Sequence, residues 1–168
     1  MRRTMLALAV ATVAAANAGD EKIDWGAIKL FEGSEMKWLV VEQTNDSRAM
    51  FGIPDSDGAL LWFDCVAKRS VKLTYVDSQL EPHAKYLVHM KAGVRTIDVT
   101  GKTDERVQLD DLVFLTTASI TDKAFLANFK KGDRLAFVID REKKGRFNAF
   151  SLPSHGSTLD PFFKACGL

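Results

Sequence analysis

Residues 59–76 read ALLWFDCVAKRSVKLTYV, and this stretch decides the fold. Apolar side chains occupy every second position in each half, which is typical of a β-strand with one buried face. The residues on these faces are Leu61, Phe63 and Cys65 in the first half and Val71, Leu73 and Tyr75 in the second. The stretch therefore predicts two consecutive strands, at 59–66 and 70–76.

Similar strand patterns recur on both sides of this stretch. They lie at 36–43, 48–53, 86–90, 94–99, 107–109, 112–117, 135–140 and 146–152. The run at 112–117 is the most continuously apolar, which suits a central strand. Between two of the patterns, Pro54 to Gly58 has turn chemistry, because Pro fixes φ and Gly accepts a positive φ.

Two segments have helical signals instead. We expect a helix at Asp122–Lys131, capped by Thr121 or Ser119 and ended by Gly132. A second, short helix is expected to begin at Asp160 as N-cap, with Pro161 at its first position, and to stop at Gly167. Many short strands with one inserted helix and a short C-terminal helix predict a mainly β, single-domain β-barrel or sandwich.

The first eighteen residues have the layout of a secretory signal peptide. Arg2 and Arg3 supply a positive region, and Met5 to Ala16 form an apolar run. Small residues at Ala16 and Ala18 then precede a cleavage site before Gly19. The run is too short to span a bilayer. We therefore expect a signal peptide at 1–18 and a single β-rich domain at 19–168 in the periplasm or outside the cell.

The chain contains two cysteines, Cys65 and Cys166. In an oxidising compartment an even number of cysteines predicts a disulfide, and no C-x-x-C motif favours redox or metal chemistry. We therefore predict a structural Cys65–Cys166 bridge.

The charges are nearly balanced, with 23 Lys and Arg against 22 Asp and Glu. Loss of Arg2 and Arg3 with the signal peptide leaves 21 against 22, a formal charge of −1. This balance gives no overall field that would attract nucleic acid. No second apolar stretch approaches membrane-spanning length, so we expect no integral membrane segment after signal removal. We also expect the protein to be a monomer.

No pattern in the sequence predicts catalysis, a metal or a cofactor. The segment Asp55 to Gly58 begins like a calcium loop, but the twelfth position, where that loop needs Glu, is Val66. His83 and His89, with Glu81, match no metal-ligand spacing. His155 follows Ser154 directly and no G-x-S-x-G motif accompanies it, so the sequence gives little support for a hydrolase.

Charged residues in the expected turns are the best candidates for contact with a partner. They are Asp55, Asp57, Lys68, Arg69, Arg141, Lys143, Lys144 and Arg146. The basic clusters among them favour an acidic partner, which we expect to be another envelope or host protein.

The segment from Phe51 to Cys65, FGIPDSDGALLWFDC, followed by the alternating Val71 to Tyr75, resembles small uncharacterised periplasmic proteins of proteobacteria. In size and layout these are loosely similar to the invasion-associated locus B proteins. A weaker resemblance, carried by Phe63 to Cys65 and Lys72 to Tyr75, is to the periplasmic inhibitors of c-type lysozyme. Neither resemblance implies a catalytic residue.

The sequence therefore favours a secreted or periplasmic, non-enzymatic binding protein. One alternative is an inhibitor of an envelope hydrolase such as lysozyme, acting through a loop at 55–58 or 141–146. A second is a small hydrolase that uses His155 or His83. A barrel interior that holds an apolar ligand is also open.

Overall fold

The computed structural model describes residues 22–33, 35–43, 46–56, 58–107 and 111–168. The expected signal peptide at 1–18 and Asp57 lie outside these ranges, as does most of the strand expected at 107–109. Within the ranges, the strands are β1 (Lys37–Gln43), β2 (Asp46–Gly52), β3 (Ala59–Ala67), β4 (Ser70–Asp77), β5 (Lys85–Ala92), β6 (Arg95–Thr103), β7 (Val113–Thr117), β8 (Leu135–Arg141) and β9 (Gly145–Leu152). The helices are α1 (Lys123–Lys130) and α2 (Asp160–Ala165).

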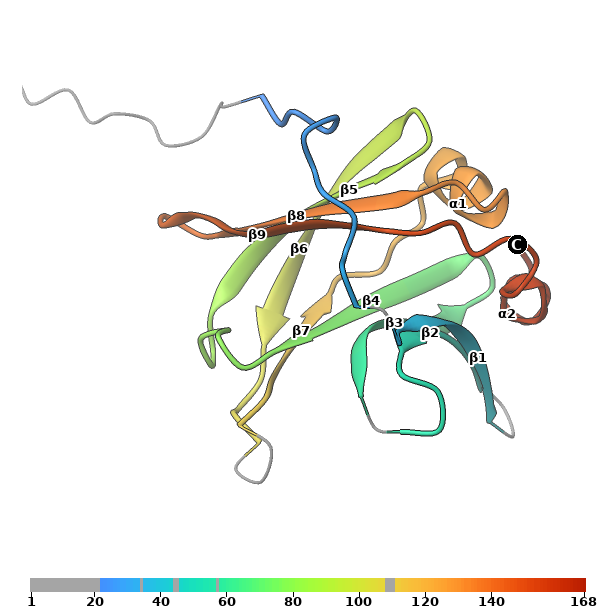
Figure 1. Cartoon of the computed structure of the whole chain (residues 1–168), viewed down its shortest axis with the longest axis horizontal. Coiled ribbons are helices and arrows are strands. Elements are labelled where there is room, and N and C mark those ends of the chain that lie inside the picture. Colours follow the sequence, from blue (N-terminus) through green and yellow to red (C-terminus); the bar gives the residue numbers. More distant parts are fainter. Residues whose placement is uncertain (1–21, 34, 44–45, 57, 108–110) are drawn as a thin grey trace, which may run out of the picture.

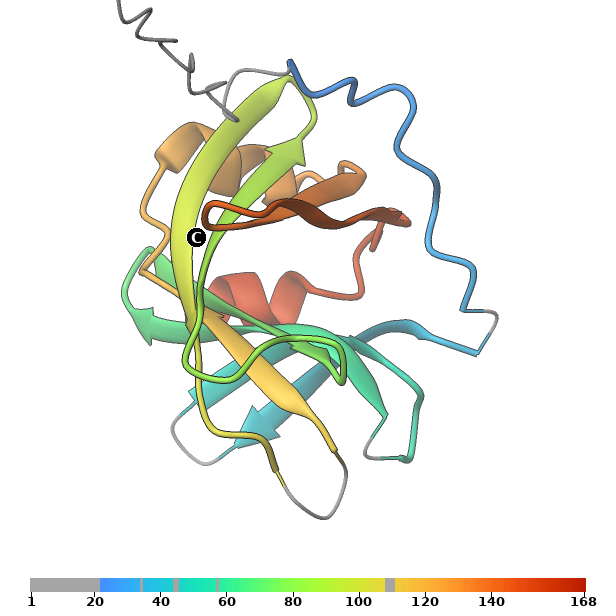
Figure 2. The same ribbon diagram turned by 90° about the vertical axis from the view of Figure 1, so that its left-hand side faces the viewer.

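These nine strands form one antiparallel sheet in the order β1-β2-β3-β4-β7-β6-β5-β8-β9. The sheet curls into a half-barrel, so the predicted mainly β fold with two helices is confirmed (Figure 1). Seen from another side, the cyan-to-green strands β1 to β4 lie below the orange β8 and β9, with the red α2 between them (Figure 2). Of the two expected architectures, a single curled sheet related to a barrel is the one adopted.

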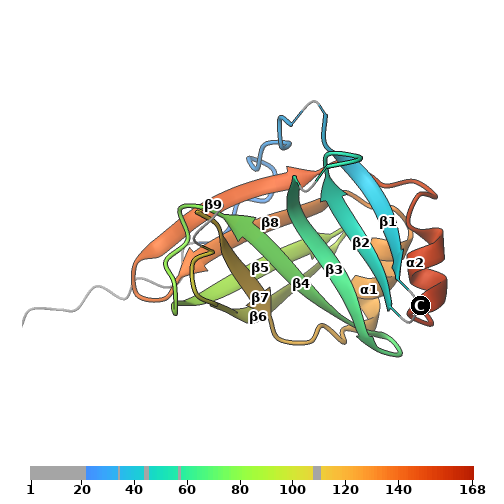
Figure 3. The same cartoon turned by 90° about the horizontal axis from the view of Figure 1, so that it is seen from below.

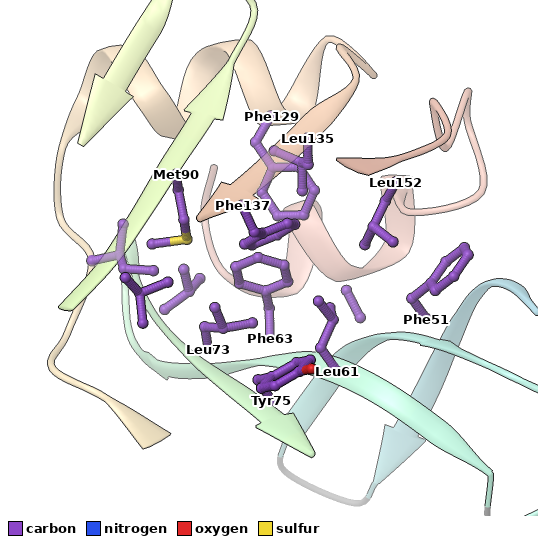
Figure 4. Close-up of a cluster of buried hydrophobic side chains, with 14 of the residues drawn as sticks. Phe51, Leu61, Phe63, Leu73, Tyr75, Met90, Phe129, Leu135, Phe137 and Leu152 are labelled. Atoms are coloured by element: carbon purple, nitrogen blue, oxygen red, sulfur yellow. The ribbon is translucent and has the colours of Figure 1, made fainter. Parts of the chain in front are cut away.

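The concave face of the half-barrel is packed with apolar side chains. Phe63 from β3 and Phe137 from β8 are completely buried and lie close together in the centre, with Tyr75 and Leu73 beside them (Figure 4). Burying one side chain of this size stabilises the fold by about 1.5–3 kcal/mol. The alternating positions at 61, 63, 71, 73 and 75 face this interior, as the sequence predicts.

The segment before β1 crosses the open side of the half-barrel. Its backbone pairs with β9, because Phe31 donates to the Ser151 carbonyl at 2.8 Å and Ser151 donates to the Lys29 carbonyl at 2.9 Å. The Phe31 ring packs edge-on against Phe51 and Phe150. From the other edge of the sheet, the Trp38 indole N–H reaches the Pro153 carbonyl at 2.8 Å. These contacts connect the two edge strands that the curled sheet leaves apart.

The two helices lie at one end of the half-barrel (Figure 3). The cap of α1 is Asp122, whose side chain accepts from the Phe125 N–H, and not Thr121 or Ser119 as expected. Asp160 is the first residue of α2 and Leu159 its N-cap, one position from the prediction. Cys166, which follows α2, is bonded to Cys65 of β3 across a Cα–Cα distance of 5.6 Å. The predicted pairing thus fixes α2 to the sheet.

Among the residues that the structure describes, no helix is long and apolar enough to cross a membrane.

Candidate functional site

The charged residues expected to contact a partner lie in three separate turns. Asp55 is in the turn between β2 and β3, with a φ of 57°. Lys68 and Arg69 form the β3–β4 turn, where the Arg69 N–H donates to the Cys166 carbonyl at 2.8 Å. The Arg69 guanidinium also donates to the Gly167 carbonyl, at 3.2 Å. The β3–β4 pair thus supports the C-terminal end of the chain.

The remaining four expected residues gather at the tip of the β8–β9 hairpin. Lys143 in its turn and Gly145 at the start of β9 adopt positive φ values, of 66° and 83°. Arg141 forms an ion pair with Glu81, and Lys144 lies 3.5 Å from the same carboxylate. Lys143 and Arg146 are exposed. The hairpin reaches the end of the molecule that lies opposite α2 (Figure 3).

A broad, open pocket lies beside this hairpin, on the convex face of β5, β6 and β8. Its volume is about 1520 Å³. Six cations line it, Lys22, Lys85, Lys102, Arg141, Lys143 and Arg146, which we call the pocket cations. Three acidic residues line it as well, Asp98, Asp140 and Glu142. With a neutral histidine the lining therefore carries a formal charge of +3, although the whole chain is close to neutral.

Half-buried apolar groups complete the pocket. Ile23 and Trp25, from the segment that precedes β1, contribute side chains to its wall. Leu87 of β5 adds a partly exposed side chain. Its neighbour Tyr86 is buried on the core face of β5 and accepts a hydrogen bond from the Glu81 N–H at 3.0 Å. Burial, and secondarily the negative charge of Asp77, raises the pKa of the Tyr86 hydroxyl. The pocket therefore offers apolar contact as well as positive charge.

One polar cluster on the pocket lining joins three strands. His89 is flanked in β5 by Val88 and Met90, which point into the core, so its own side chain faces the convex side. Its Nδ1 lies 2.7 Å from Asp98 of β6, and its Nε2 lies 3.2 Å from Asp140 of β8. The His89 side chain is only 14% exposed. Nothing in the sequence marks this cluster, because Asp140 is 51 residues from His89 along the chain and reaches it only through the strand order.

The other two histidines lie in different surroundings. His83 is exposed in the β4–β5 turn, with a φ of 55°. His155 is 5% exposed and packs among aromatic rings that include Trp38, Phe129 and Phe163. Both of its ring nitrogens face backbone carbonyls, of Gly156 at 2.8 Å and of Phe129 at 2.6 Å. Its contacts are those of a histidine that holds a loop to a helix.

In the described ranges, no group of three or more His, Cys, Asp or Glu side chains is arranged to hold a metal ion.

Comparison with known proteins gives no match: no family model, curated protein or solved structure is similar to the chain. The resemblances to locus B proteins and to lysozyme inhibitors therefore stay predictions, and the function is argued from the geometry.

Proposed function

We propose that the protein is a periplasmic or secreted binding protein that takes an acidic partner at the pocket beside the β8–β9 hairpin. The observation that carries the proposal is the gathering of six cations around one open pocket in a chain of nearly balanced charge. Complementary charge steers a partner to such a surface and suppresses encounters with the wrong one. Trp25 adds an aromatic contact of the kind enriched in protein interfaces.

The size of the pocket favours a macromolecular partner. Sites for small molecules are typically about 300–1,000 Å³ and enclose most of the ligand. This pocket is larger, at about 1520 Å³, and open. An acidic segment or loop of another protein fits these dimensions better than a small metabolite does. The interior of the half-barrel, by contrast, is filled with packed side chains in the part of the chain that the structure describes (Figure 4).

An inhibitor of an envelope hydrolase is the second candidate, and the shape of the β8–β9 hairpin favours it. The hairpin reaches one extreme of the molecule, where its exposed Lys143 and Arg146 could enter an acidic cleft (Figure 1). Both candidates use the same end of the protein. They differ in whether binding blocks the activity of the partner.

The proposal is tested with a double charge reversal, Lys143→Glu with Arg146→Glu. Both side chains are exposed, so the fold should tolerate the change. The matched control reverses two exposed lysines on the helices at the other end, Lys123→Glu with Lys164→Glu. Binding of the mature chain to poly-L-aspartate is measured by calorimetry at several salt concentrations. We expect saturable binding that weakens with salt and is lost in the hairpin variant alone.

Equal loss in both variants would contradict the proposal, because any surface lysine would then serve. Affinity capture from envelope and host extracts with the same three proteins identifies the partner. Adding the mature chain to lysozyme and following cell-wall hydrolysis separates the two candidates. Stoichiometric loss of activity that the hairpin variant fails to produce would favour the inhibitor.

A further inference from the structure

We propose that His89 is a pH-sensitive bridge on the lining of this pocket, closed when the imidazole is protonated and opened when it is neutral. Both ring nitrogens face carboxylate oxygens, of Asp98 at 2.7 Å and of Asp140 at 3.2 Å. Carboxylates are acceptors only, so both contacts are hydrogen bonds in the imidazolium form alone. A neutral ring donates to one carboxylate and turns a lone pair toward the other.

The bridge connects β5 with both of its neighbours in the sheet: β6, which follows it directly in the chain, and β8, which is distant in sequence. His89 lies directly opposite Asp98 in the β5–β6 pair. Asp140 is diagonal to it, because the residue opposite Asp140 in the β5–β8 pair is Leu87. The ring thus sits between a carboxylate on each neighbouring strand. Losing one of these contacts changes the local packing on the convex face without touching the interior.

Asp140 is the partner that depends most on this bridge. Its Oδ1 is shielded from solvent and has no hydrogen-bond donor among the described residues. Asp98 is in contrast 64% exposed, so water can solvate its carboxylate when His89 does not. When the imidazole is neutral, we therefore expect the ring to remain hydrogen-bonded to one aspartate. The other carboxylate should then bind water or one of the pocket cations.

The consequence for binding rests on the proposed function. The charged groups that share the pocket with His89 are Asp98 on β6, Asp140 on β8, Glu142 and the pocket cations. Protonation raises the formal charge of the lining from +3 to +4 and neutralises part of the field of the two aspartates. An acidic partner should then bind more tightly in mildly acidic conditions. Imidazole is the side chain that ordinarily changes charge between pH 5 and 8.

The bridge itself is tested without a ligand, by nuclear magnetic resonance of the mature chain at about pH 5.5 and about pH 8, on either side of the ordinary imidazole pKa of about 6.5. At the lower pH we expect two hydrogen-bonded ring N–H groups on His89. Between the two conditions the backbone amides of 96–98 and 138–140 should shift. The shifts should vanish in His89→Gln and persist in the matched control His83→Gln. Unchanged amides in the unaltered protein would overturn the bridge.

A second variant keeps His89 but replaces the carboxylate that would otherwise face a lone pair of the neutral ring. In Asp98→Asn the amide can donate to Nδ1 while Nε2–H donates to Asp140, so a neutral ring satisfies both neighbours. The pH-dependent amide shifts should therefore shrink in this variant although the imidazole is retained. Shifts as large as those of the unaltered protein would mean that they report the charge of the ring and not a bridge, and would overturn the proposal.

The binding arm uses poly-L-aspartate at the same two pH values and constant ionic strength. We expect affinity to fall about two- to fivefold at the higher pH, the range for one partly exposed charge, and to stay level in His89→Gln. Binding with equal pH dependence in both proteins overturns the regulatory role and leaves the proposed function standing. If poly-L-aspartate binds at neither pH, the proposed function is contradicted. The His89 bridge is then tested by the magnetic resonance experiments alone.

Discussion

Tyr75 lies in the interior of the half-barrel with its hydroxyl between two polar side chains. It donates to Asp77 at 2.7 Å and accepts from the Asn148 amide at 2.9 Å. Burial raises the pKa of Tyr75 far above its ordinary value, and the hydrogen bond to Asp77 raises it further. The pKa of Tyr86, the other tyrosine of the chain, is raised mainly by burial. In the folded protein both phenols therefore hold their protons in alkali.

The burial of the two tyrosines predicts that the folded protein loses stability at high pH. The unfolded chain releases its tyrosine protons near pH 10 while the folded chain retains them, so stability falls as pH rises above about 10. Tyrosinate absorbance should consequently appear together with the loss of circular dichroism in an alkaline titration. Tyrosinate forming while the dichroism remains native would contradict this. Tyr75→Phe should cost about 1–2 kcal/mol at neutral pH, because the half-buried side chains of Asp77 and Asn148 lose a hydrogen-bond partner.

At the scale of the element, the alternation of apolar residues was a good guide to the strands. It predicted β3 and β4 to within one residue at each end, and the apolar run at 112–117 is β7, which lies between β4 and β6. The caps were harder to predict. Ser119, Thr121 and Asp122 are all good N-cap residues, and sequence preference alone does not rank them. Arg95, the first residue of β6, contributes to the choice by pairing with Asp122.

Asp122 therefore has two roles, as the cap of α1 and as the partner of Arg95. The Arg95 hydrogen bond is the main reason that the pKa of Asp122 is lowered, followed by the bond from the Phe125 N–H. A lowered pKa stabilises the fold above the ordinary aspartate value of about 3.9, and this stabilisation is lost as pH falls through the folded value. Asp122→Ala should lower the free energy of unfolding by about 1 kcal/mol at neutral pH.

Urea unfolding of this variant at neutral pH and at about pH 3 checks both statements. The difference from the unaltered protein should be smaller in acid, because the unfolded chain binds a proton at this carboxylate there and part of the stabilisation from the lowered pKa is lost. Lys123→Ala, which changes the exposed neighbour and leaves the cap in place, is the control. A cost that is the same at both pH values would show that the charge of Asp122 has no part in it.

At the scale of the whole molecule, the strand order is the feature that local sequence patterns do not predict. Local patterns predicted each strand, yet nothing in them places β7 beside β6 or β8 beside β5, because such pairings depend on how the entire sheet curls. The same limit explains the candidate site. The basic hairpin at 141–146 was predicted because its residues are adjacent, whereas Asp98, His89 and Asp140 meet only when β6, β5 and β8 are neighbours.

The disulfide is the one long-range contact that the sequence did predict, and its energetic effect is global. It closes a loop with a sequence separation of 101, for which the chain-entropy model gives about 4–5 kcal/mol. Cys65→Ser with Cys166→Ser should therefore lower the melting temperature by roughly 10 °C or more in a domain of this size. Calorimetry of the variant, and of the unaltered protein with a reductant, measures the loss. An unchanged melting temperature in both would contradict it.

The position of this bond also decides how the protein responds to tension. Cys166 lies two residues before the last residue, Leu168, and its partner Cys65 is in β3. A force that pulls on the two ends passes from Leu168 through the sulfur atoms directly to β3. The strands from β4 to β9 and both helices then carry no load, and only the part of the chain before Cys65 can be drawn out. Pulled in this way, the segment before β1 would leave β9 and take Lys22, Ile23 and Trp25 out of the pocket wall. Next, β1 and β2 would peel from the sheet, while the β8–β9 hairpin stays folded.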